Sequence, residues 1–446
     1  MGLGGSILMR VCVHGLWHLG AVTAACLASA GHQVVALDEN ASAVAALNGG
    51  TPPLYEPGLA ELLEAGLESN RLIFTTDASA ALADCEVYWV TFDTPVDEND
   101  VPDVNFVLDR VKQSLPTLAP GCVVLVSSQL PVGSTRALAR YAELSGFGTL
   151  TFGYLPENLR LGKAIEVFTK PDRVVVGVSS PSDEEKVRAL LRPFTDSLLF
   201  MSIESAEMTK HAINAFFATS VAFANEIGVL CEHVGANASE VTRGLRSEAR
   251  IGPSAYVAPG LPFSGGTLAR DVEILNNLTA QLRLDLPLLP AVRASNEHHR
   301  DWAMRRLADT LDGITGRTIA ILGLTYKPGT DTLRRSSALE LARKLVGVGA
   351  SVRAFDPKIK SLPNCPSITL AQSIQDAVAG AEAAVIATEW PQFKSEDWNA
   401  IASLMATPVI VDPGGFVADR LSGNREVTYL AVGRMLWPQN RRIGTS

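Results

Sequence analysis

The sequence predicts an α/β protein in which two doubly wound parallel-sheet domains are joined by a long central helix within a helical dimerisation segment. Three observations support this fold class. Strand-like and helix-like stretches alternate from Arg10 to about Phe200, residues 204–234 form one helical run without a breaker, and a second strand-and-turn pattern begins at residue 316. Such alternation is typical of βαβ units, whose strands lie parallel in one sheet.

The first domain, residues 1–200, is predicted from a series of short apolar runs. The run "RVCVHG" is followed by a helix of small residues that ends near Ser29 and by a second strand, "HQVVALD". Three further runs have the length and β-branched composition of buried strands, namely "EVYWVTF" (86–92), "CVVLVSS" (122–128) and "RVVVGVS" (173–179).

The rest of the chain divides into a helical segment and a second, smaller α/β domain. The helical segment covers residues 201–312, and Gly235 gives its first helix a natural end. Its many apolar positions favour a role in dimerisation. The second domain, residues 313–446, opens with "GRTIAILGLTYKPGT" (316–330) and continues through "ASVRAFD" (350–356), "AAVIATE" (383–389) and "TPVIVD" (407–412).

Composition and charge narrow the class of protein. The 446 residues are 47% hydrophobic and 19% charged, which is ordinary for a chain of two or three globular domains. A net charge of −9 argues against a nucleic-acid partner. The six cysteines have no metal-ligand spacing, so we expect buried free thiols, a cytoplasmic location and no metal site. Residues 11–30 are apolar, but histidines and glycines interrupt them, so we expect a strand, a loop and a helix, with no membrane association.

The stretch "GLWHLG" (15–20) has two of the three glycines of a dinucleotide-binding loop. In such a loop the first glycine makes the turn, the second lets backbone approach the pyrophosphate, and the third lets the helix pack on the strand. Gly15 and Gly20 stand at the first and third positions, and Trp17 occupies the second. Asp38 ends the next strand, where an acidic residue binds the adenosine ribose, and its charge favours NAD over NADP. The register of Asp38 therefore favours a Rossmann-like NAD site over a merely structural turn, with Trp17 turned away from the phosphates or covering them.

Further motifs extend over nearly the whole chain. In the first domain they are "PLYEPGL" (53–59), "TP" (94–95), "PVG" (131–133) and "LPENLRLGKAIEVFTKPDRVVVG" (155–177). They continue with "AEMTKHAINAF" (206–216), "GLTYKPGTDTLRRSS" (323–337), "ATEWPQF" (387–393) and "VGR" (432–434). In this order the motifs resemble the UDP-glucose/GDP-mannose dehydrogenase family. The segment from residue 155 is similar to the family's substrate-loop signature NPEFLREG, and the segment from residue 206 is similar to its catalytic helix.

The resemblance implies a dimer whose subunits each hold an NAD domain, a long central helix and a nucleotide-sugar domain. The family's typical reaction oxidises the C6 alcohol of a nucleotide hexose to the acid and uses two NAD in sequence. A cysteine attacks the intermediate aldehyde, a second hydride leaves, and the resulting thioester is hydrolysed.

Positions that match the family's motifs supply candidate catalytic residues. Lys210 and Asn214 are four residues apart and therefore share a helix face, where they can orient a substrate oxygen and stabilise charge on it. Glu157 matches an acidic residue that acts as general base or activates water. Asp271, in "TLARD" (267–271), matches the aspartate that closes the family's GGSCFPKD-like loop. From spacing alone, an exposed lysine and a surface asparagine would be the simpler interpretation.

The resemblance also assigns binding residues. Arg250 and Lys327 match basic residues that contact the nucleotide sugar, and Arg334 matches one near the cofactor. Guanidinium and ammonium groups suit diphosphate oxygens, although solvated surface charge is the alternative for all three. The other candidates are Thr94 and Gln129 for the cofactor, and Leu159, Arg160, Tyr256 and Gly265 for the substrate.

The departures from the family's pattern gather around the reacting carbon. Thr267 occupies the place of the cysteine in "PFSGGTLARD", and no cysteine lies near it in the sequence. A threonine hydroxyl is far less acidic than a thiol, whose pKa is about 8.5, and needs a dedicated base. Gln129 replaces a threonine of the family's STVPVG segment, and Asn158 and Leu161 replace the usual Phe and Glu of the substrate loop.

These residues favour an NAD-dependent nucleotide-sugar dehydrogenase, similar to UDP-glucose 6-dehydrogenases, that keeps hydride transfer and alters the covalent second stage. It would yield an aldehyde and one NADH, unless Thr267 or an aldehyde hydrate activated by Glu157 replaces the thiol. The alternative is a catalytically silent nucleotide-sugar-binding protein with a regulatory or scaffolding role. A β-hydroxyacid dehydrogenase of related build would not account for residues 316–446. We expect a homodimer that binds a nucleotide-diphosphate sugar, whose base and hexose the sequence leaves open.

Overall fold

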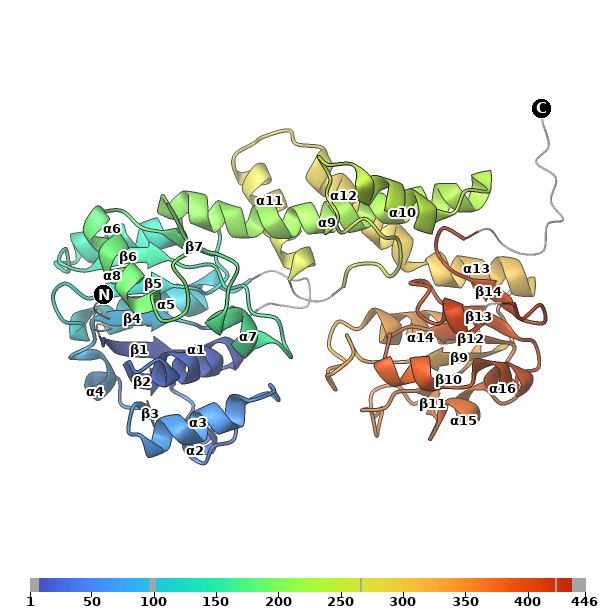
Figure 1. Ribbon diagram of the computed structural model, residues 1–446, viewed down its shortest axis with the longest axis horizontal. Coiled ribbons are helices and arrows are strands. Elements are labelled where there is room, and N and C mark those ends of the chain that lie inside the picture. The colour runs from blue at the N-terminus through green and yellow to red at the C-terminus, as the bar shows by residue number, and fades with distance from the viewer. Residues whose placement is uncertain (1–7, 96–101, 265–266, 422, 435–446) are drawn as a thin grey trace, which may run out of the picture. The chain divides into compact units, whose positions relative to one another are not determined.

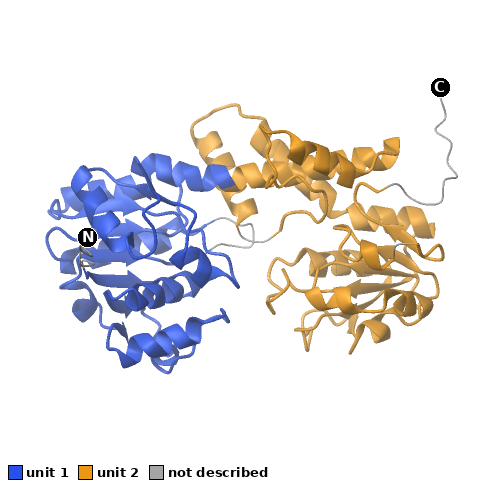
Figure 2. Cartoon of the chain, viewed as in Figure 1, with its two compact units in different colours: residues 1–213 blue, residues 214–446 orange. Residues whose placement is uncertain are grey.

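The computed structural model describes residues 8–95, 102–264, 267–421 and 423–434. The chain forms two compact units, unit 1 (residues 1–213) and unit 2 (residues 214–446), shown in different colours in Figure 2. Each unit contains one α/β sheet, and the boundary between the units falls within the longest helix. The predicted α/β class, with a sheet domain at either end of a long helix, is confirmed.

Unit 1 is built on an eight-stranded sheet with the order β3-β2-β1-β4-β5-β6-β7-β8. The strands are β1 (Arg10–His14), β2 (Gln33–Leu37), β3 (Leu72–Thr75), β4 (Val87–Val90), β5 (Val123–Val126), β6 (Thr151–Tyr154), β7 (Val174–Gly177) and β8 (Leu198–Met201). The strand order reverses between β1 and β4, and ligands bind at such a switch point in doubly wound sheets.

One strand pair of unit 1 differs from the predicted parallel arrangement. The strands β6 and β7 pair antiparallel, at Tyr154 and Gly177, whereas all the other neighbours are parallel. A parallel connection needs a crossover, usually a helix that spans the sheet. The connection between β6 and β7 holds only the six-residue helix α7 (Ala164–Thr169), which packs on α1 (His18–Ser29).

Helices cover both faces of this sheet (Figure 1). Successive residues of its central strands point to opposite sides, so the strands contribute side chains to an apolar cluster on each face. Val11 and Val13 of β1 join one apolar cluster, whereas Cys12 joins the other. The first cluster includes residues of α1, α2, α3 and α8, and the second includes residues of α4, α5 and α6. The bounds of these helices are α2 (Ala41–Asn48), α3 (Leu59–Glu68), α4 (Ala78–Leu82), α5 (Val104–Ser114), α6 (Ser134–Leu144) and α8 (Pro181–Leu191).

Unit 2 contains a six-stranded parallel sheet with the order β11-β10-β9-β12-β13-β14. Its strands are β9 (Thr318–Leu322), β10 (Ser351–Phe355), β11 (Ile368–Leu370), β12 (Ala383–Ile386), β13 (Val409–Val411) and β14 (Thr428–Leu430). The α-helices that lie wholly in unit 2 are α10 (Ala238–Ser247), α11 (Leu268–Gln281), α12 (Leu288–Arg300), α13 (Trp302–Leu311), α14 (Ser337–Gly347), α15 (Ile374–Val378) and α16 (Trp398–Ser403). This strand order also reverses, between β9 and β12, so unit 2 repeats the doubly wound pattern.

The long helix α9 (Ile203–Val234) begins in unit 1 and continues into unit 2. Its first turns are held by Glu207, whose buried carboxylate accepts hydrogen bonds from the N–H groups of Gly133 (2.6 Å) and Thr135 (3.0 Å) at the start of α6. Farther along, Ala218 and Ala222 pack in a small apolar cluster with residues of α11 and α12. Among the described residues, α9 alone is long and apolar enough to cross a membrane by length and composition, and half of its most apolar stretch is buried.

A buried histidine joins the first strand of unit 1 to α8. The Nδ1 atom of His32 accepts a hydrogen bond from the Met9 N–H (3.2 Å), and its Nε2–H donates to the Leu190 carbonyl (3.1 Å). Both bonds together require the neutral ring. Burial lowers the pKa of His32 below its usual value of 6.5, because the charged imidazolium is poorly solvated there.

We predict that His32 makes the stability of the protein depend on pH in mildly acidic solution. Because the pKa of His32 is lower in the folded state, its contribution is complete above about pH 6.5 and is lost as the pH falls below that value, by at most about 1.4 kcal/mol per pH unit for one proton. Thermal unfolding between pH 7.5 and 5.5 checks this. The slope of Tm against pH should be shallower in His32→Gln than in the wild type, whereas His233→Gln, a change at an exposed histidine, should keep the wild-type slope. Equal slopes for all three proteins would contradict the prediction.

Candidate active site

Two glycines shape the loop between β1 and α1. Gly15 has φ of +99°, and its N–H donates to the Leu37 carbonyl (3.0 Å). A Cβ at Gly15 would lie 2.9 Å from the backbone of Phe92, and one at Gly20 would lie 1.9 Å from the Gly15 carbonyl oxygen. Glycine is therefore required at both positions, for the turn and for the contact between helix and strand that the sequence predicts.

Trp17 stands at the middle position of this loop in ordinary extended backbone. Its φ is −73° and its ψ is −162°, a conformation that any L-residue adopts, and the side chain is 50% exposed. The backbone at this position therefore does not require glycine, and a side chain here bears on the space beside the start of α1.

Asp38 lies at the end of β2 and holds the loop. Its Oδ2 atom accepts from the Leu16 N–H (2.7 Å) and its Oδ1 atom accepts from the Asn40 N–H (2.8 Å). Asp38 remains partly exposed, as a residue that binds a ribose hydroxyl must be. The turn, the start of α1 and this carboxylate together fit the adenosine, ribose and pyrophosphate parts of NAD.

A second carboxylate, that of Glu39, follows directly after Asp38 in the sequence and was not among the predicted site residues. Glu39 lies 3.1 Å from His14 Nε2 and 3.7 Å from the Arg110 guanidinium. The hydrogen bond from His14 is the main reason why the pKa of Glu39 is lowered to about 2, so that the side chain stays charged. Two adjacent carboxylates repel a 2′-phosphate, which agrees with NAD as the cofactor.

Lys210 and Glu157 meet in unit 1. Lys210 is 7% exposed, and its Nζ atom donates to the backbone carbonyl of Glu157 and lies 3.7 Å from that residue's Oε2 atom. The Oε1 atom of Glu157 accepts from the Leu159 N–H, so the carboxylate is held within the loop of residues 155–163. An ammonium group buried beside a carboxylate can assist proton transfer at an alcohol.

Asn214 and Asp271 form a second buried pair, in unit 2. The Asn214 side-chain amide donates to Asp271 Oδ2, and Asp271 has no exposed surface. Asn214 lies four residues after Lys210 on α9, as the spacing predicts. The simpler interpretation, an exposed lysine and a surface asparagine, is wrong, because both side chains are buried.

Thr267 precedes α11 and is exposed. Among the described residues its side chain makes no hydrogen bond that caps the helix. All six cysteines are free and buried. Thr267, which the sequence analysis matches to the family's cysteine, is thus a surface residue.

The other predicted residues occupy varied surroundings. Thr94 is buried and its hydroxyl donates to the Gln129 carbonyl (2.8 Å), which brings these two cofactor candidates together. Arg250 has an 88% exposed side chain and forms a local ion pair with Glu248 (2.8 Å). Tyr256 is exposed and meets Phe217 edge-on. The remaining candidates are Leu159, packed on the core of unit 1, Lys327, partly buried, and Arg160 and Arg334, both exposed. Gly265 lies outside the described residues.

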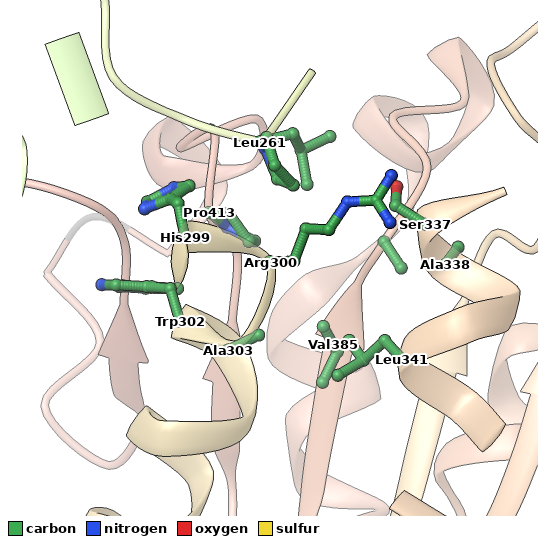
Figure 3. A pocket seen from close by; sticks show the side chains of 12 residues that line it. Leu261, His299, Arg300, Trp302, Ala303, Ser337, Ala338, Leu341, Val385 and Pro413 are labelled. Atoms are coloured by element: carbon green, nitrogen blue, oxygen red, sulfur yellow. The ribbon is translucent and has the colours of Figure 1, made fainter. Parts of the chain in front are cut away.

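Figure 3 shows a pocket in unit 2 that the sequence did not indicate. It lies beside the carboxyl ends of β12 and β13 and the start of α14, close to the point where the strand order reverses. Doubly wound domains bind nucleotides at such points. Its lining is largely apolar, and Arg300 extends into it toward Ser337, the first residue of α14 (Figure 3).

The fold and these side chains define an oxidoreductase class: an NAD-binding domain, a helix that carries a buried lysine and asparagine, and a second doubly wound domain. Comparison with known families agrees with this class. The models of the UDP-glucose/GDP-mannose dehydrogenase family match with their NAD binding domain at residues 9–195, central domain at 204–298 and UDP binding domain at 320–419.

Individual relatives cover almost the whole chain. A UDP-glucose 6-dehydrogenase of Pseudomonas aeruginosa is 35% identical over 96% of this chain and 98% of its own length. The structure of a UDP-glucose dehydrogenase from Pyrobaculum islandicum has a TM-score of 0.85 and 31% identity, and covers 97% of this chain and 100% of its own. That of a UDP-D-ManNAc dehydrogenase from Pyrococcus horikoshii has a TM-score of 0.84 and 26% identity, covering 96% and 99%. The chain belongs to the UDP-glucose/GDP-mannose dehydrogenase family, and it is an NAD-dependent nucleotide-sugar dehydrogenase.

We predict that replacing Trp17 with glycine strengthens NAD binding. The change leaves the loop conformation accessible and removes a ring from the route of the pyrophosphate, so KM for NAD should fall by roughly 3- to 10-fold, equivalent to about 0.7–1.4 kcal/mol. Initial rates of NADH formation at varied NAD check this, with Trp17→Phe as a control that keeps an aromatic ring. An unchanged or higher KM in Trp17→Gly would show that the indole does not obstruct the cofactor.

Proposed function

We propose that the chain oxidises the C6 primary alcohol of a UDP-hexose, and that UDP-glucose is the first substrate to test. The observation that carries the proposal is the buried Lys210, whose ammonium group is held against Glu157 in the loop similar to the family's substrate signature. The names of the curated relatives, UDP-glucose 6-dehydrogenases, and the match to the family's UDP binding domain support UDP as the nucleotide.

The buried polar groups suit the first oxidation. When an alcohol is oxidised to an aldehyde, the carbon gives up a hydride and the oxygen gives up a proton. Bound NAD supplies the hydride acceptor. We assign Lys210 and Asn214 to the substrate oxygen, where an ammonium and an amide stabilise developing negative charge, and Glu157 to the departing proton.

The second oxidation needs a different route at Thr267. Without a thiol, no thioester forms at this position, so the aldehyde is released or takes up water. A hydrate, R–CH(OH)₂, can give a second hydride to NAD and leave as the acid, with Glu157 accepting the proton. We propose that release of the aldehyde dominates, because a threonine hydroxyl is far less acidic than a thiol and needs a dedicated base to attack a carbonyl.

The stoichiometry of turnover tests this proposal. With a panel of nucleotide sugars, we expect UDP-glucose to yield one NADH per sugar and an aldehyde by mass spectrometry, whereas Thr267→Cys should yield two NADH and a uronic acid. Trapping with a hydroxylamine separates a released aldehyde from a hydrate. Two NADH in the wild type would refute the truncated reaction. No NADH with any sugar, together with tight sugar binding, would support the silent binding protein instead.

We further propose that the protein is a homodimer formed along α9. Six large apolar side chains of this helix are exposed, and four of them recur at intervals of seven and four residues: Phe216, Phe223, Leu230 and Val234. This spacing places them on one helix face, in a stripe about 27 Å long. A second copy of the chain would cover the stripe. We also retain the cytoplasm as the location, and the three domains 1–200, 201–312 and 313–446, as proposals.

Replacing one residue of the stripe tests the dimer. In Phe223→Glu we expect a shift from dimer to monomer, because the change removes an apolar contact worth about 1.5–3 kcal/mol per buried side chain and buries a charge. Light scattering coupled to size exclusion measures the mass. Leu404→Glu, at an exposed leucine after α16, is the matched control and should remain dimeric. A monomeric wild type would contradict the proposal.

A further inference from the structure

A single buried carboxylate joins two loops of unit 1. Glu56 lies in the loop between α2 and α3 and is 3% exposed. Its Oε1 atom accepts from the Ala164 N–H (2.8 Å), and its Oε2 atom accepts from the Gly162 N–H (2.8 Å) and from His18 Nε2–H (3.0 Å). A carboxylate so deeply buried must be held by donors, and here three donors share it.

The donors belong to two segments with different tasks. His18 is the first residue of α1 and adjoins the loop in which a pyrophosphate would sit. Gly162 and Ala164 close the loop of residues 155–163 and begin α7. Glu56 is thus the point at which the cofactor loop and the proposed substrate loop are tied together.

The loop that Glu56 holds also contacts Lys210. Residues 155–160 have no regular secondary structure, so side-chain contacts contribute to their position beside the backbone hydrogen bonds at either end. The loop is held by Glu56 at its end, by Leu159 packed on the core, and by the bond from Lys210 to the Glu157 carbonyl. Whatever fixes Glu56 therefore also helps to fix the carbonyl to which the Lys210 ammonium group donates.

We propose that His18 and Glu56 are positioning residues that couple cofactor binding to sugar binding. The proposal rests on the assignment of loop 155–163 to the substrate. A bound pyrophosphate orders the first turn of α1, and with it His18. Part of the ordering of the sugar loop is then already complete when the sugar arrives, so each ligand strengthens the binding of the other by the same factor.

Binding measurements without turnover test this coupling. The probes are NADH, which cannot accept a hydride, and the nucleotide sugar oxidised fastest in the panel, titrated by calorimetry. In the wild type we expect the sugar to bind at least about 5-fold more tightly when NADH is present, and NADH to gain the same factor from the sugar. In His18→Phe the factor should fall to about 1, whatever the change in the Kd of either ligand alone, because the factor is the ratio of two Kd values of the same variant.

Matched variants separate coupling from a general structural effect. His18→Gln keeps an N–H donor near the position of Nε2 and should restore the factor, and His298→Phe, at an exposed histidine, should leave it unchanged. If His18→Phe fails to fold, Glu56→Gln is the second variant, because an amide cannot accept from all three donors. A wild-type factor of 1, or equal factors in the wild type and His18→Phe, would overturn the proposal. Absence of turnover with every sugar would instead refute the proposed function.

Discussion

The active site depends on carboxylates that bind the backbone N–H groups of loops. Loops that follow the strands of a parallel sheet leave backbone donors without partners, and such donors are costly when buried. Among the described residues, the acidic side chains that each accept from two or more backbone N–H groups include Asp38, Glu56, Glu207 and Asp356. They fix, respectively, the cofactor loop, the loop of residues 155–163, the start of α9 and the first loop of the second sheet. Two of them, Glu56 and Glu207, hold the elements on either side of Lys210, the loop of residues 155–163 and the start of α9.

The first loop of each sheet contains a glycine with positive φ and is held by an aspartate from the neighbouring strand, but the two aspartates differ in exposure. Gly15 and Gly323 each have positive φ and donate to the last residue of the neighbouring strand, and Asp38 and Asp356 each accept from the residue that follows the glycine. Asp38 is partly exposed and can bind a ribose. Asp356 is 2% exposed and also accepts from Trp390 Nε1 (3.0 Å) and the Thr325 hydroxyl (3.2 Å). The oxygens of Asp356 already accept hydrogen bonds within the protein, so a nucleotide bound to the second domain would need other groups as partners.

Local patterns in the sequence predicted much of this structure. Hydrophobic runs located the central strands, because a strand buried on both faces is apolar along its length, and the glycines with Asp38 located the cofactor loop. The antiparallel β6–β7 pair escaped prediction, since its cause is the short α7 between the strands. The role of Glu56 escaped as well. Glu56 forms hydrogen bonds with residues 38 and 106 positions away in the sequence, and the local pattern of hydrophobic and polar residues does not indicate contacts over such separations.

The surroundings of Thr267 agree with the proposal that the first oxidation does not depend on a thiol at this position. Threonine often caps helices, yet here it makes no capping bond among the described residues, so the residue brings no evident structural gain at this position. The groups proposed to assist hydride transfer are hydrogen-bonded in the pairs of Lys210 with Glu157 and of Asn214 with Asp271. Neither pair includes Thr267. Under the proposed function, Thr267 in place of a cysteine removes the nucleophile of the covalent stage and leaves both pairs with their partners, so that the two stages of the reaction would rest on different residues.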